Sequence, residues 1–219
     1  IDMAQVEGIF VSHEHSDHIA GLQQLLKRFD IPVYTKQGTW REIQDKLIVP
    51  KNRLIELTKG SLTLGSLIVE PFSVSHDAAD PIGINVFAGN DKATIVTDTG
   101  VISDDILRRI DDTTLLVLEA NYDPHMLRFG PYQPFLKQRV ASDEGHLSNE
   151  MAAQALLMMK RPDFMQVILA HRSENNNNSV LVTQTIGKML VDGGVRIGPE
   201  MKLQHGQPNE IVSIQSVKR

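Results

Sequence analysis

The sequence predicts an α/β layered fold with its helices on the outside. Residues 54–96 alternate apolar and polar side chains around a hairpin turn, which is typical of antiparallel strands. Strand and helix patterns alternate from about residue 100 onward, which indicates a sheet covered by helices. Polar residues suited to metal binding also follow several predicted strands. We therefore expect a candidate site at one edge of the sheet.

Each predicted element rests on a local pattern. Short apolar or alternating runs indicate strands, and Leu115–Leu118, which is wholly apolar, indicates a buried one. Apolar residues at helical spacing indicate helices, and Ser148 has the side chain and position of an N-cap. Residues 122–145 are expected to be irregular. The strands are expected at residues 6–12, 31–34, 54–57, 61–64, 66–75, 82–88, 93–96, 115–118, 165–170 and 211–214, and the helices at 17–29, 39–47, 103–110, 148–160 and 179–192.

The composition is ordinary for a globular protein, and residues 1–219 fit a single domain with 41% hydrophobic residues. The absence of cysteine excludes zinc fingers and iron–sulfur clusters, leaves histidines and carboxylates as metal ligands, and fits a cytoplasmic location. No apolar run reaches about 18 residues, so no membrane span is expected. The net charge of −5 argues mildly against a nucleic-acid partner, although bound dications can supply a positive field at a phosphate site.

The stretch Val11–His18 organises the expected site. It contains the pattern His-x-His-x-Asp-His between a predicted strand and a predicted helix. Imidazoles and a carboxylate suit zinc, manganese or iron. A solvated polar loop is the alternative interpretation, but ligands this close together would be costly to leave unpaired in a fold interior. The candidate ligands are His13, His15, Asp17 and His18.

Three further residues, His76, Asp98 and His171, also come just after predicted strands. Taken singly, each has a simpler interpretation as a surface histidine, a turn residue or a strand cap. Loops at one edge of a sheet converge, so we expect all seven side chains to meet. They suffice for two metal ions about 3.5–4 Å apart that share one carboxylate and hold a bridging hydroxide as the nucleophile.

These motifs resemble the metallo-β-lactamase fold, whose hallmark is His-x-His-x-Asp-His followed by a later His, Asp and His. Within that fold, the chain resembles the YycJ/WalJ (VicX) family over residues 1 to about 180 and beyond. The resemblance implies a four-layer αββα sandwich and a cytoplasmic metal-dependent hydrolase regarded as an exonuclease. The strings that carry it are Pro71–Ala78, Leu118–Asn121, Gly130–Tyr132, Leu136–Arg139, Gly145–Glu150 and Leu169–Asn176.

The resemblance also implies how the ligands are divided between two metal ions. One ion would be held by His13, His15 and His76, the other by Asp17, His18 and His171, with Asp98 bridging them.

The resemblance further implies residues outside the metal ligands. His146 matches the proton donor of related phosphodiesterases, and a histidine can titrate near neutrality and protonate an alkoxide leaving group. We expect Asp17 and His146 to act in catalysis. Backbone amides at the start of the helix after residue 148 can hold a phosphate. The expected phosphate-binding residues are Ser148, Ser173, Asn175 and Asn176.

One departure concerns the N-terminal end. The fold normally opens with a sheet of early strands, one of which ends in an Asp-Gly-type motif, and Asp2 does not fill that role. We therefore expect the domain at residues 1–219 to be N-terminally incomplete. The ligands are unaffected, but the support that the missing aspartate gives them is in doubt.

Two relatives within the fold are disfavoured by their ligands. The best-known zinc β-lactamases use a cysteine where Asp98 stands, and flavodiiron proteins use a glutamate where His15 stands. A glyoxalase-II-like thioester hydrolase shares the ligand set and stays an alternative. A non-catalytic regulatory module that keeps the metal for structure is the other, although structural zinc sites are usually closed.

His146 and the basic residues Lys137 and Arg139 favour phosphodiesters, because a thioester needs neither a proton donor nor positive charge beside the metals. The sequence therefore predicts a dinuclear metal-dependent phosphodiesterase that uses zinc or manganese, or else iron. DNA as the substrate and cleavage from an end are implied only by the family resemblance.

Overall fold

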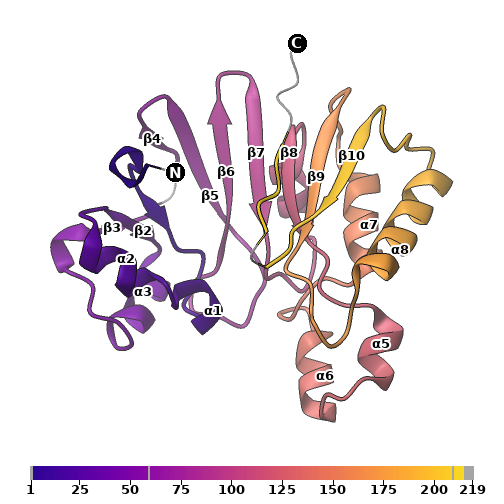
Figure 1. Cartoon of the computed structure of the whole chain (residues 1–219), viewed down its shortest axis with the longest axis horizontal. Helices are drawn as coiled ribbons and strands as arrows, with labels where there is room; N and C mark the ends of the chain where they lie inside the picture. The colour runs from indigo at the N-terminus through magenta and orange to yellow at the C-terminus, as the bar shows by residue number, and fades with distance from the viewer. Residues whose placement is uncertain (1, 59, 209, 215–219) are drawn as a thin grey trace.

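The computed structural model describes residues 2–58, 60–208 and 210–214, and its elements form four layers (Figure 1). Two sheets lie in the middle, and helices cover the outer face of each. This arrangement confirms the predicted αββα sandwich. In the described part of the chain, every helix is too short or too polar to cross a membrane.

The smaller sheet has the strand order β1-β2-β3, and all its pairs are parallel. Parallel neighbours need crossover connections, and helices supply them here. These helices bury apolar side chains such as Leu22 and Ile43 against Val11 and Val33. The strands are β1 (Ile9–Phe10), β2 (Val33–Thr35) and β3 (Leu54–Glu56), and the helices are α1 (Ser16–Ile19), α2 (Leu22–Arg28) and α3 (Gln37–Gln44).

The larger sheet has the order β10-β9-β8-β7-β6-β5-β4. The pairs from β4 to β7 are antiparallel, and those from β7 to β10 are parallel. Consecutive parallel strands therefore end at the same edge of the sheet. The strands are β4 (Leu62–Leu64), β5 (Leu67–Ser73), β6 (Ile82–Ala88), β7 (Asp91–Val96), β8 (Leu115–Glu119), β9 (Met165–Ala170) and β10 (Met201–His205).

The main core lies between the larger sheet and its covering helices α4 (Asp104–Ile110), α7 (Asn149–Met158) and α8 (Ser179–Asp192). Each of these helices begins with a side-chain cap, which satisfies backbone N–H groups that otherwise lack a partner. The caps are Ser103, Ser148 and Asn178. The two sheets meet through a separate cluster in which Tyr34 and Leu57 pack with Val69, Ile82 and Ile84.

Several expected elements are wrong in their bounds or partners. The strand at 54–57 is parallel to β2 in the smaller sheet, because alternation indicates a strand but not its neighbour. The helix at 17–29 is interrupted at Ala20 and Gly21, where glycine disfavours a helix interior. Residues 211–214 are not a strand, and the last strand is instead β10.

Residues 122–145 are also more regular than expected. They contain the helices α5 (Pro124–Phe129) and α6 (Pro134–Val140). Each helix begins at a proline, whose fixed backbone angle suits the first helical position. Two of the three prolines in this stretch therefore start helices, and only Pro131 lies in the connection between them.

Candidate metal centre

The first ligand group lies on the loop that joins β1 to α1. His15 is the N-cap residue of α1, and Ser12 holds two neighbouring rings, since its Oγ lies 3.1 Å from Nδ1 of His13 and 3.2 Å from Nδ1 of His18. His76 reaches this loop from the segment after β5. Its Nδ1 donates a hydrogen bond to the carbonyl of Gly145 over 3.0 Å, which leaves Nε2 free to face the other histidines.

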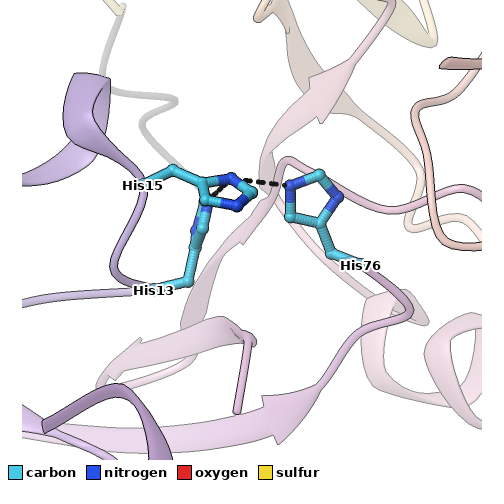
Figure 2. Close-up of side chains that lie close together, drawn as sticks. All are labelled: His13, His15 and His76. Atoms are coloured by element: carbon cyan, nitrogen blue, oxygen red, sulfur yellow. Dashed lines mark hydrogen bonds between the residues drawn. The ribbon is translucent and has the colours of Figure 1, made fainter. Parts of the chain in front are cut away.

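His13, His15 and His76 converge on one point, as Figure 2 shows. Nδ1 of His15 lies 3.1 Å from Nε2 of His13 and 3.2 Å from Nε2 of His76. A tetrahedral zinc ion with Zn–N bonds of about 2.0–2.1 Å separates its nitrogen ligands by about 3.3–3.4 Å. The spacing of these three rings is therefore close to that of a metal site.

Asp17, His18 and His171 form the second group. Oδ2 of Asp17 lies 3.5 Å from Nε2 of His18 and 3.7 Å from Nε2 of His171. His171 comes directly after β9, so a residue distant in sequence joins the loop after β1. This group is more open than the first, since Asp17 is exposed.

Asp98 lies between the two groups and is buried. Its Oδ2 is 3.3 Å from Nε2 of His18, and its Oδ1 is 3.4 Å from Nε2 of His171 and 3.8 Å from Nε2 of His76. Asp98 and His171 both have a positive φ, of 56° and 53°, which a non-glycine residue adopts at some cost in energy. The structure thus accepts backbone strain at the two positions that bring the groups together.

Glu119 was not singled out from the sequence, and it holds two of the histidines. It is fully buried at the end of β8, and its Oε1 accepts hydrogen bonds from Nδ1 of His146 over 2.8 Å and from Nδ1 of His171 over 2.7 Å. Its Oε2 accepts from the backbone N–H groups of Thr99 and Leu147. Glu119 therefore fixes the orientation of both rings and leaves Nε2 of each available on the other side.

The rule that polar residues follow strands at this edge applies to Glu119 as well, since it is the last residue of β8. Its partners, however, come from after β9 and from the loop before α7. No local pattern in the sequence indicates such contacts.

The charges in the centre favour cation binding. Burial and the positive fields of His18, His76 and His15 lower the pKa of His13 to about 3, so this ligand is neutral. Burial alone would raise the pKa of Glu119, but hydrogen bonds from His146 and His171 lower it to about 2. A buried carboxylate at this position therefore stays ionised.

The pKa of His171 is shifted upward, opposite to that of His13. Burial alone would lower its pKa, but the hydrogen bond to Glu119 raises it to about 9. In the absence of metal His171 is thus protonated near neutral pH, and a divalent ion would take the place of that proton.

The donor set fits divalent metal ions. Oδ2 of Asp98 and Oδ1 of Asp77 are buried and accept no hydrogen bond from any residue that the structure describes. A buried anionic oxygen without a hydrogen bond is costly, and a cation would satisfy it. Four overlapping groups of histidines and carboxylates have ligand atoms within 4.8 Å of one another. Imidazole and carboxylate ligands suit zinc, manganese and iron.

A cavity of about 1070 Å³ opens beside His146 and His171. Ser173 and Asn175 line it, as does Arg139, whose guanidinium donates to the carboxylate of Asp77. Part of the positive charge expected from the Lys137–Arg139 stretch is therefore neutralised. The cavity is large enough for a small ligand or a nucleotide.

Two of the expected phosphate-binding residues lie elsewhere. Ser148 is buried and its Oγ accepts from the N–H of Met151, so it serves as the cap of α7. Asn176 is fully buried and does not line the cavity. The structure therefore places Ser173 and Asn175, but not these two side chains, where a substrate could reach them.

Comparisons with known proteins agree with this geometry. A family described as "Beta-lactamase superfamily domain" matches residues 1–171. The chain is 35% identical to exodeoxyribonuclease YycJ of Bacillus anthracis over 219 residues, which covers 99% of this chain and 83% of that protein. It is 31% identical to exodeoxyribonuclease WalJ of Streptococcus pneumoniae over 209 residues, which covers 93% of this chain and 77% of that protein.

Among solved structures, the metallo-β-lactamase fold protein YhfI of Bacillus subtilis superimposes with a TM-score of 0.68 at 15% identity. The match covers 94% of this chain and 77% of that one. At 15% identity, this similarity is evidence for a shared fold alone.

Proposed function

Because the chain belongs to the β-lactamase superfamily and, within it, to the family of YycJ and WalJ, we propose that it is a dinuclear phosphodiesterase that shortens DNA from an end. That the chain is a metal-dependent hydrolase follows from the family. The number of metal ions, the role of His146 and the cleavage of DNA from an end belong to the proposal.

One observation carries the proposal. Asp98 lies within 3.8 Å of His76 in the first group and within 3.4 Å of His171 in the second. His146 stands beside both groups, with its Nδ1 3.8 Å from Oδ1 of Asp98, and is held by Glu119. A structural metal site has no need of a second group or of an adjacent oriented histidine. This arrangement supports hydrolysis over the alternative of a regulatory module.

The chain's own residues would divide the work as follows. The two groups, with Asp98 between them, would hold the metal ions, which would supply an activated water and neutralise charge on the phosphate. Ser173 and Asn175 line the cavity that would receive the nucleic acid. When the phosphorus–oxygen bond breaks, His146 delivers its proton from Nε2 to the leaving oxygen.

Glu119 supports this last step through His146. Its carboxylate accepts a hydrogen bond from Nδ1, so the proton to be delivered is the one on the opposite nitrogen, Nε2. The role of Asp17 as a catalytic residue beyond metal binding stays a prediction, as does the cytoplasmic location.

Digestion of end-labelled nucleic acids tests the proposal. Single- and double-stranded DNA and RNA are incubated with the metal-free chain reconstituted with Mn²⁺ or Zn²⁺. We expect label to be released from DNA as mononucleotides or short products, and faster than from RNA.

Two results would overturn it. Hydrolysis of a glutathione thioester together with intact phosphodiesters would favour a thioester hydrolase. The absence of hydrolysis of either class by the metal-loaded chain would favour the regulatory module.

A further inference from the structure

Helices α5 and α6 form a hairpin, residues 124–140, that projects beyond the edge at which β8 and β9 end (Figure 1). The hairpin has a small core of its own, made by Leu127 and Val140 with Tyr122. The metal-binding loops lie at the same edge. Tyr132, Leu136 and other hairpin residues line the cavity beside His146, so the hairpin is one wall of that cavity.

Two phenylalanines on the hairpin point outward. Phe129 is 67% exposed and Phe135 is 71% exposed. Phenylalanine is usually buried, and each of these side chains leaves a large apolar surface in water. Neither is needed for the core of the hairpin, which consists of other residues. The exposed rings are therefore available to a partner.

The charged residues of the hairpin have one sign. Residues 124–140 contain three basic residues and no aspartate or glutamate, in a chain whose net charge is −5. Arg139 is paired with Asp77, which leaves Arg128 and Lys137 without an acidic partner on the hairpin itself. The guanidinium of Arg128 lies over the ring of Phe129, 5.3 Å from its centroid, and the ring of His125 lies 4.6 Å away. Lys137 bonds to the carbonyl of Arg128, which keeps two cations close together.

Exposed aromatic rings among cations match the chemistry of a single-stranded nucleic acid. Unpaired bases stack on aromatic side chains, and basic residues attract the phosphates between them. A duplex offers its phosphates but not the faces of its bases, so the phenylalanines would gain little from one. A second copy of this chain would bury the rings but would also bring Arg128 and Lys137 close to their own counterparts.

We propose that the hairpin binds a single-stranded stretch of nucleic acid next to the metal centre, with Phe129 and Phe135 stacking on bases and Arg128 and Lys137 contacting phosphates. This inference rests on the proposed function for the identity of the substrate. It adds a binding surface outside the site that breaks the phosphodiester bond.

The test uses the double variant Phe129→Ala/Phe135→Ala of the full chain and a fluorescein-labelled phosphorothioate single strand that resists cleavage. Each base stacked on an aromatic ring is worth about 1–3 kcal/mol, so we expect binding weaker by about 10-fold or more in fluorescence anisotropy. Turnover of bis-p-nitrophenyl phosphate should stay within about twofold of the unaltered chain, because Phe129 and Phe135 do not line the cavity beside His146. The matched control is Met158→Ala, which removes a side chain that is 68% exposed on α7.

Two further variants separate stacking from charge. Phe129→Trp/Phe135→Trp keeps aromatic faces and should restore binding. Arg128→Gln should make the slope of log affinity against log salt concentration shallower by the amount expected for about one phosphate contact. Unchanged affinity in the double alanine variant would overturn the inference. A change in its oligomeric state by light scattering, with affinity for the single strand unchanged, would assign the surface to a second copy. Failure of the unaltered metal-loaded chain to cleave any phosphodiester would count against the proposed function instead.

Discussion

We expect His146→Ala to lower DNA hydrolysis by about 10²- to 10⁴-fold, the range typical of a lost general acid, and to leave the metal content unchanged. The reason is that His146 is held by Glu119 beside the ligand groups but is not needed to complete either of them. The alkoxide of a sugar is a poor leaving group and needs a proton, whereas p-nitrophenolate leaves readily without one. Turnover of bis-p-nitrophenyl phosphate should therefore fall much less than turnover of DNA in the same variant.

The measurement is the rate of each substrate beside the metal content by mass spectrometry. His205→Ala is the control, because it removes a histidine of β10 that bonds to Thr183, belongs to no ligand group and lies outside the hairpin. An equal loss on both substrates would contradict proton donation. The loss of one equivalent of metal would show that His146 is itself a ligand. Its ring nitrogen lies close enough to Asp98, Glu119 and His171 to share a metal ion with them.

Asp98→Ala should reduce the bound metal from two equivalents to one or fewer and abolish measurable turnover of both substrates. Asp98 is the carboxylate that reaches ligands of both groups, so neither metal would keep its full set without it. Metal ions supply several kcal/mol of transition-state stabilisation, and each 1.36 kcal/mol is a factor of ten, so a loss of roughly 10³-fold or more is expected.

Asp163→Ala serves as its control, since this aspartate is exposed and lies before β9, away from the ligand groups. Circular dichroism would show whether the Asp98 variant is folded. A folded variant that kept two metals and normal turnover would remove Asp98 from its proposed bridging position.

The local part of the site was predictable from the sequence because it depends on order along the chain. His13 to His18 occupy one loop, and the rule that ligands follow strands also indicated His76, Asp98 and His171. The structure brings all seven together at one edge of the sheets. The αββα layers were likewise expected, since the resemblance to the metallo-β-lactamase fold rests on that spacing.

Features that depend on tertiary contacts were not predictable in this way. Glu119 became part of the site only through hydrogen bonds to His146 and His171, which the sequence separates from it by 27 and 52 residues. Ser148 was expected to bind phosphate, but its oxygen is used to cap α7. The parallel pairing of β3 with β2 was not predictable either, because an alternating pattern does not indicate which strand lies beside it.

Within the described residues, β1 is an edge strand of the smaller sheet, and the loop and helix after it carry four of the candidate ligands. Asp77 and its bond to Arg139 are a further feature that sequence reasoning missed, and this pair connects α6 to the segment that carries His76.

If two metal ions act in one centre, turnover depends on the second ion, and a metal titration measures that dependence. Metal-free chain is titrated with Mn²⁺ or Zn²⁺ while bound metal and turnover of a phosphodiester are measured in the same samples. We predict that turnover reaches its plateau at two equivalents of bound metal per chain. A plateau at one equivalent, or two equivalents bound with no turnover, would contradict the account.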